Sequence, residues 1–159
     1  MAKKRLKTNA IRLLEQRSID FDVLEYTVND GQVDGISVAT KMNQPQELVY
    51  KTLVTHAGAD IFIFVIPVAA TLELKAAAKA VGVKKVEMLP LDQLLTTTGY
   101  VRGGCSPVGM KKMYPTIIDV SAKNYERIIV SAGKVGLQLH INVDDLERVT
   151  HAKFETITQ

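Results

Sequence analysis

The chain has 159 residues, of which 47% are hydrophobic and 23% are charged, and its formal net charge is +3. This length suits one hydrophobic core, so we expect residues 1–159 to fold as a single domain. No apolar run approaches the roughly 20 residues that span a bilayer, and no signal-peptide pattern follows the basic N-terminus. Because the only cysteine, Cys105, cannot form an internal disulfide, we expect a reducing cytoplasmic location and no membrane partner.

The spacing of apolar residues and turn formers predicts helices and strands in irregular alternation. In chain order we expect a helix over 3–17, a strand over 21–26, a short helix over 36–42, strands over 48–55 and 61–65 joined by a turn at 57–60, a helix over 72–81, strands over 86–88, 117–119, 128–131 and 137–141, a helix over 144–149 and a strand over 154–157. Thr71 and Asn142 are the expected N-caps of the last two helices. This order favours an α+β fold, with a mixed sheet or partial barrel flanked by helices.

Residues 98–112 have the most unusual composition, because they include four glycines, one proline and three cations. Adjacent glycines such as Gly103 and Gly104 let backbone N–H groups approach a bound anion or carbonyl without a Cβ in the way. The segment is not a Walker A loop, since Gly104 and Gly109 have that spacing but are followed by Met110 and not by lysine. We therefore expect a ligand-binding loop, whose lysines favour a phosphate.

The chain offers few side chains for nucleophilic or metal-dependent chemistry. No histidine lies near Cys105 in the sequence to act as its base, which favours a small apolar filler over a nucleophile. His56, His140 and His151 lack the i, i+4 spacing of a helical metal site, and with one cysteine they cannot form a common zinc set. We expect neither a metal nor a cofactor.

Lys51 stands out because it lies within an apolar strand, where alternation places it on the face opposite Tyr50 and Thr52. One interpretation is an edge lysine that prevents association between strands. The other is a cation held rigidly beside a pocket, where it binds an anion such as a terminal phosphate. The sequence pattern leaves both open.

The turn at residues 131–136 also allows two interpretations. It could be a plain hairpin connection. It could instead form a second wall of a site, in which Gly133 permits close backbone approach and Lys134 adds charge. Tyr26, at the end of an expected strand, is typical of the edge of a core.

Several motifs, in order along nearly the whole chain, resemble the YbaK/EbsC proteins, which are free-standing relatives of the editing domain inserted in bacterial prolyl-tRNA synthetases. The resemblance rests on Tyr50-Lys51-Thr52-Leu53, the helix at 74–77 leading to 82–86, Thr98-Gly99-Tyr100, Gly103-Gly104-x-Ser106-Pro107-x-Gly109 with Lys111-Lys112, and the turn at 131–136. Two positions depart from the family pattern. Cys105 stands where an aliphatic residue is usual, and the expected Ser-Gly-Gly-Lys-Arg-Gly turn reads Ser-Ala-Gly-Lys-Val-Gly, with one cation fewer.

The resemblance implies an aminoacyl-tRNA deacylase that clears mischarged tRNA, with Cys-tRNA(Pro) as the usual substrate of the YbaK branch. It also implies that Lys51 holds the phosphate of the terminal adenosine and that the backbone of Gly103 lines the aminoacyl pocket. Further expected contacts with the substrate, or residues that shape its loop, are Tyr26, Gly104, Ser106, Pro107, Gly133 and Lys134. The expected partner is the acceptor end of the tRNA, and a transient complex with prolyl-tRNA synthetase is a second.

Members of this family are believed to use the substrate's own thiol as the nucleophile, which would account for the missing catalytic side chains. Backbone N–H groups of residues 103–106 are then candidates to stabilise the oxyanion. Two other functions remain open from the sequence. One is an editor of alanyl- or seryl-tRNA that uses water or a ribose hydroxyl, and the other is a non-catalytic tRNA-binding or regulatory module.

Overall fold

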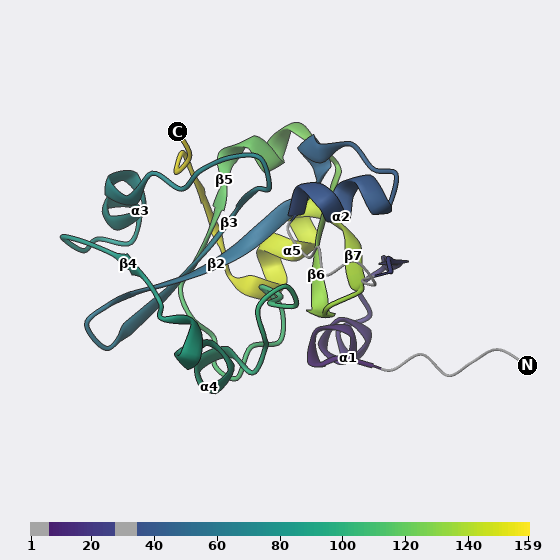
Figure 1. The fold of residues 1–159 in the computed structure, drawn as a ribbon, viewed down its shortest axis with the longest axis horizontal. Helices are drawn as coiled ribbons and strands as arrows, with labels where there is room; N and C mark the ends of the chain where they lie inside the picture. The colour runs from purple at the N-terminus through teal and green to yellow at the C-terminus, as the bar shows by residue number, and fades with distance from the viewer. Residues whose placement is uncertain (1–6, 28–34) are drawn as a thin grey trace, which may run out of the picture.

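The computed structural model describes residues 7–27 and 35–159, which form two β-sheets with helices around them (Figure 1). The smaller sheet is antiparallel and has the order β1-β7-β6, formed by Phe21–Glu25, Leu137–Asn142 and Arg127–Lys134. The larger sheet is mixed and has the order β4-β2-β3-β5-β8, formed by Glu87–Met88, Tyr50–Ala57, Asp60–Pro67, Thr116–Asp119 and Lys153–Glu155. The prediction of an α+β fold with a mixed sheet is confirmed, as is the hairpin of β2 and β3.

The helices of the described residues are α1 (Asn9–Gln16), α2 (Gly35–Lys41), α3 (Leu74–Ala80), α4 (Leu94–Thr98) and α5 (Val143–Thr150). Short 3₁₀ turns occupy Gln46–Leu48, Leu91–Gln93 and Val120–Asn124. The sequence pattern did not predict α4, because five residues rich in threonine carry no amphipathic period. None of the described helices is long and apolar enough to cross a membrane.

Two predicted helix starts are wrong, and in each case a side-chain cap explains the observed start. The hydroxyl of Thr8 accepts the backbone N–H of Ile11, so α1 begins after Thr8; residues 3–6 of the predicted helix lie outside the described residues. The carboxylate of Glu73 accepts the N–H groups of the two residues after Leu74, so Glu73 and not Thr71 caps α3.

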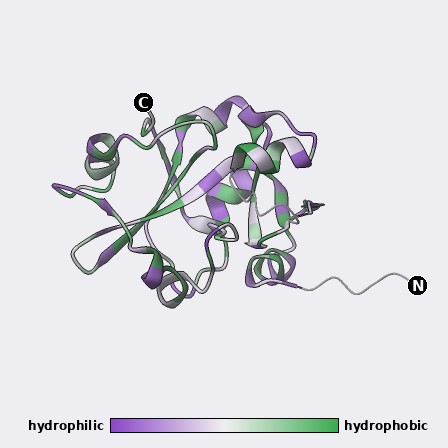
Figure 2. Ribbon diagram, viewed as in Figure 1, coloured by the Kyte–Doolittle hydropathy of each residue, from purple (hydrophilic) through white to green (hydrophobic). Residues whose placement is uncertain are grey.

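The core lies on both faces of the central strands, which carry green, hydrophobic segments in Figure 2. On one face, Ile118 of β5 packs with Leu139 of β7, with α1 and with α5. On the other face, Phe64 of β3 packs against α3. A parallel bridge between Val49 and Ile129 then brings the beginning of β2 beside β6. The two sheets therefore meet at the beginning of β2, close to Lys51.

Asn142 provides a test of the local folding signals, because it was predicted as a cap and acts as one. Its Oδ1 accepts the backbone N–H groups of Asp144 at 2.9 Å and Asp145 at 3.4 Å. Asn142→Ala should lower the free energy of unfolding by about 1 kcal/mol, as measured by urea denaturation. Asn124→Ala, in an exposed 3₁₀ turn, is the control and should change it by less than about 0.5 kcal/mol. Equal losses in the two variants would contradict the capping role.

Candidate functional site

A cavity of about 160 Å³ lies where the two sheets meet the glycine-rich segment. It is lined by residues from β2, from the loop after α4, from β6 and from β7: Tyr50, Lys51, Thr52, Gly103, Cys105, Ser131 and Gln138. The cavity is small and partly open to solvent, so it can hold a group the size of an amino acid while the rest of a larger ligand stays outside. The structure thus brings the predicted residues Lys51 and Gly103 into one small cavity.

Lys51 contributes a half-buried cation to this cavity. On the preceding residue, Tyr50 is 2% exposed, and a 2.7 Å hydrogen bond joins its hydroxyl to Ser121 Oγ. Burial raises the pKa of Tyr50 to about 12, so this bond persists across the physiological pH range. No carboxylate of the described residues pairs with the Lys51 ammonium group. Strand β2 pairs with β3 along its whole length, whereas β4 pairs with it only at Thr55 and His56, so the pairing alone does not exclude an edge position for Lys51. These observations favour a cation available to an anionic ligand.

Two residues of the glycine-rich segment, Gly103 and Cys105, line the same cavity. Gly104 N donates to Val101 O at 3.0 Å, and Gly103 has a φ of +82°, as at the third position of a type II turn. This φ favours glycine, which explains the residue at 103. Within the described part of the chain, the N–H groups of Gly103 and Cys105 donate to no acceptor. Among the predicted donors at 103–106, these two therefore belong to residues that line the cavity, and no described residue accepts their N–H groups.

Gly104 sets the distance between the walls of the cavity. A Cβ on this residue would lie 2.9 Å from Val135 N and 3.1 Å from Lys134 Cα. Both are backbone atoms, so they could not move aside as a flexible side chain would. Gly133 has a related role, because a Cβ there would lie 2.7 Å from Cε1 of the Tyr100 ring. Both predicted glycines thus serve close packing behind the cavity and do not line it.

Strand β6 extends further than predicted. Ser131 pairs with Gln138 and Lys134 pairs with Leu137, so the two residues between Ser131 and Lys134 form a bulge and the connection to β7 is only residues 135–136. The predicted turn at 131–136 is therefore mostly strand. The bulge also explains the φ of +99° at residue 133, which a side chain would strain.

Besides Gly104 and Gly133, four predicted substrate-binding residues lie outside the cavity lining, namely Tyr26, Ser106, Pro107 and Lys134. Tyr26 is buried, its backbone N–H donates to Gly136 O, and its hydroxyl has no hydrogen-bond partner. Ser106 is buried beneath the loop, where its Oγ accepts the N–H two residues ahead. Lys134 is exposed. Their contacts with a substrate remain predictions.

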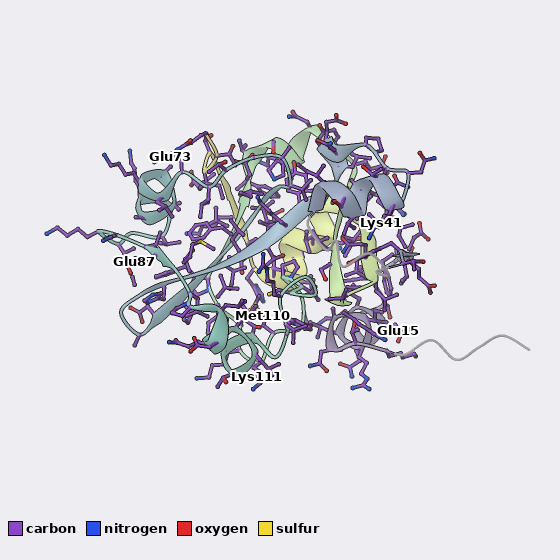
Figure 3. All side chains as sticks on the ribbon, viewed as in Figure 1. Glu15, Lys41, Glu73, Glu87, Met110 and Lys111 are labelled. Atoms are coloured by element: carbon purple, nitrogen blue, oxygen red, sulfur yellow. The ribbon has the colours of Figure 1, made fainter. Side chains whose placement is uncertain are left out.

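Lys111, one of the cations of the glycine-rich segment, lies beside α4 together with Met110 (Figure 3). Its Nζ donates to Thr96 O at 3.2 Å. The lysine thus fastens the loop to α4, and it does not line the cavity.

Cys105 lines the cavity with a half-buried thiol. Burial raises the pKa of this thiol to about 11, and a hydrogen bond with Thr98 opposes the shift. A thiol with so high a pKa stays protonated at pH 7 and is a poor nucleophile, which supports the interpretation of Cys105 as filler. Among residues 7–27 and 35–159, no three His, Cys, Asp or Glu side chains are grouped as metal ligands would be.

Gln138 is a cavity residue that the sequence analysis missed. It lies on β7, the middle strand of the smaller sheet, and is 6% exposed. No hydrogen bond joins its carboxamide to another described residue, and its polar atoms are not among those sealed without a partner, which are Tyr26 OH and Thr52 Oγ1. The sequence signal is a single glutamine between Leu137 and Leu139. On its own this alternation indicates a strand with one polar face, which is usually the solvent face.

The fold and the cavity define an α+β protein with a site for a small group beside a cation that no described carboxylate neutralises. Residues 31–149 match the aminoacyl-tRNA editing domain, and the chain belongs to this family. It is 43% identical to EbsC of Enterococcus faecalis, a proposed Cys-tRNA(Pro)/Cys-tRNA(Cys) deacylase, over 161 residues that cover 99% of this chain and 98% of the relative. The resemblance found in the sequence is confirmed.

Solved structures share the same fold. A proposed trans-editing enzyme for prolyl-tRNA synthetase superposes with a TM-score of 0.85 at 20% identity, covering 98% of this chain and 99% of the other. A protein described as hypothetical also has a TM-score of 0.85, at 18% identity, covering 96% and 100%. At these identities the likeness concerns the fold alone.

The packing of Gly104 can be tested through the single cysteine. Gly104→Ala should push the loop away from the β6–β7 turn, lowering the free energy of unfolding by about 1–3 kcal/mol. Because Cys105 is the next residue, its thiol should also react faster with a disulfide reagent such as Ellman's reagent. Gly58→Ala is the control for backbone strain without a clash, because its φ is +61° but nothing lies within 4 Å of a Cβ there; it should lower stability and leave the thiol reactivity unchanged. Unchanged thiol reactivity in Gly104→Ala would show that the loop tolerates a side chain there.

Proposed function

We propose that this protein is an aminoacyl-tRNA deacylase that hydrolyses the ester of mischarged Cys-tRNA, with Cys-tRNA(Pro) as its main substrate. The observation that carries the proposal is the cavity itself, which Lys51, Gly103 and Cys105 line together, with no described residue pairing with the Lys51 ammonium group or accepting the N–H groups of Gly103 and Cys105. The identity of 43% to EbsC over almost the whole chain supports the substrate, and Cys-tRNA(Cys) is included in the name of that relative. Such a reaction belongs in the cytoplasm, where tRNA is charged.

The proposed binding mode follows from what each group can hold. Lys51 binds the phosphate of the terminal nucleotide, because a lysine ammonium is a compact charge that donates to phosphate oxygens. The ester carbonyl points at the N–H groups of Gly103 and Cys105. The aminoacyl group then occupies the cavity, whose small size favours a small side chain. A transient complex with prolyl-tRNA synthetase would add selectivity for tRNA(Pro).

In the proposed reaction the substrate supplies its own nucleophile. The cysteine sulfur, as a thiolate, attacks the ester carbonyl carbon, the bond from that carbon to the ribose oxygen breaks, and this oxygen takes up a proton. The product is a four-membered thiolactone, which water opens to free cysteine. The described lining of the cavity holds no histidine, aspartate or glutamate that could act as a base. The protein accelerates the step by holding sulfur and carbonyl together and by donating two hydrogen bonds to the oxyanion.

Removing the Lys51 charge should weaken the phosphate contact and leave the fold intact. Lys51→Met should lower kcat/KM for Cys-tRNA(Pro) by about 10- to 100-fold, as expected for losing a hydrogen bond to a charged group. The slope of log affinity against log salt should also become shallower by about 0.7, the share of one phosphate on a single strand. Lys84→Met, at an exposed position outside the cavity, serves as the control. Full activity in Lys51→Met would refute the phosphate role.

The nucleophile can be identified by changing the substrate. Cys-tRNA(Pro) should be cleaved far faster than Ser-tRNA(Pro), because a thiol ionises appreciably near neutral pH and an alcohol does not. The pocket cannot reject the similar hydroxyl strongly by size. The rate with cysteine should rise with pH through the pKa of the substrate thiol. Comparable rates for cysteinyl, seryl and S-methylcysteinyl esters would instead identify water or a ribose hydroxyl as the nucleophile.

A further inference from the structure

Gln138 is a buried polar side chain of the cavity without a partner in the described protein. It is 6% exposed and lies directly opposite Ser131 of the neighbouring strand, which lines the same cavity. A buried carboxamide normally has hydrogen-bond partners, since burial without them costs free energy. Gln138 Oε1 and Nε2 are therefore available to a ligand that occupies the cavity.

The other side-chain oxygens of the cavity are engaged or closed off. The Tyr50 hydroxyl is bonded to Ser121, and Ser131 Oγ accepts the backbone N–H of Gly133 at 3.2 Å. Thr52 Oγ1 has no partner, but it is sealed from solvent. No carboxylate is among the described lining residues, and Lys51 offers only donors. Gln138 Oε1 thus offers both of its lone pairs to a ligand that carries N–H donors, whereas Ser131 Oγ has one of its two already engaged.

We propose that Gln138 binds the α-ammonium group of the aminoacyl ester through Oε1, an inference that rests on the proposed function. The α-ammonium carries three N–H donors and loses water when it enters the cavity, so it requires an acceptor there. Lys51 repels this group, and Gln138 lies on the wall formed by the other sheet. A neutral amide accepts the hydrogen bond without competing with the phosphate for Lys51, as a carboxylate would.

This contact makes Gln138 a specificity-determining residue for the free amino group. An ester whose amino group is acylated, as in a peptidyl-tRNA, has lost the charge and two of the donors. It would leave Gln138 poorly paired, and a buried group left unpaired discriminates strongly between substrates. The site would therefore select aminoacyl-tRNA over peptidyl-tRNA, irrespective of the amino-acid side chain.

The test compares two esters that differ only in the α-amino group, Cys-tRNA(Pro) and 3-mercaptopropionyl-tRNA(Pro). Both keep the thiol and the ester, and the ratio of their kcat/KM values is measured for wild type and variants. Gln138→Met, nearly isosteric and without an acceptor, should lower kcat/KM for Cys-tRNA(Pro) by about 10- to 100-fold and for the deaminated ester by less than about threefold. Comparing the change in ratio between proteins cancels the different intrinsic reactivities of the esters.

Gln138→Glu provides the second variant. It retains an acceptor, so Cys-tRNA(Pro) should be cleaved within a few-fold of the wild-type rate. The deaminated ester should be cleaved at least tenfold more slowly, because an unpaired carboxylate is then buried. Thr55→Val is the matched control. Thr55 is fully buried and donates to Phe62 O at 2.9 Å outside the cavity, so its loss should leave the ratio unchanged.

Each outcome bears on the proposal. An equal fall for both esters in Gln138→Met would overturn it, since Gln138 would then only shape the cavity. Equal losses in Gln138→Met and Gln138→Glu for Cys-tRNA(Pro) would overturn it as well, because the amide donors and not the acceptor would matter. If Gln138→Met fails to fold, an unchanged ratio in Gln138→Glu decides against it. A wild type that cleaves neither ester would instead refute the proposed function.

Discussion

The cavity depends on one close approach, that of the Gly104 backbone to the backbone of the β6–β7 turn. The walls come from two sheets and a loop, and no covalent link or metal cluster of the described residues joins them. A Cβ on Gly104 would lie 2.9 Å from the backbone of this turn, so the loop can pack against the turn only because glycine has no Cβ. That contact places Gly103 and Cys105 opposite Lys51. Gly104, which was predicted to contact the substrate, thus sets the width of the site through its packing.

The positive charge of Lys51 within the cavity is a second organising feature. Lys51 stands on β2 of the larger sheet, and the described lining contains no carboxylate to neutralise it. The Cys105 thiol is neutral because burial disfavours the thiolate, so it adds no negative charge beside Lys51. A positive charge in a partly desolvated space has a longer reach than the same charge in water. The site therefore attracts an anion without a side chain that could act as a base.

The sequence predicted features whose causes are local. The hairpin of β2 and β3, the cap at Asn142 and the glycine-rich loop depend on neighbouring residues, and each was found. Lys51 was found because a lysine in an apolar strand is itself a local anomaly. Gln138 was missed because the alternation of polar and apolar residues shows which face of the strand a residue is on, but not whether that face meets solvent or a cavity. The bulge in β6 and the sealed position of Tyr26 depend on tertiary packing in the same way.

The pairing of β1 with β7 has a consequence for the timing of synthesis. These strands lie near opposite ends of the chain, and the cavity takes walls from β2 and from β7. Contacts so distant in sequence form late, since the long intervening loop must close first. When Lys51 emerges from the ribosome, the strand that carries Gln138 has not yet been synthesised. The growing polypeptide is therefore unable to enclose an aminoacyl ester until β7 has been synthesised, and the site arises only after that point.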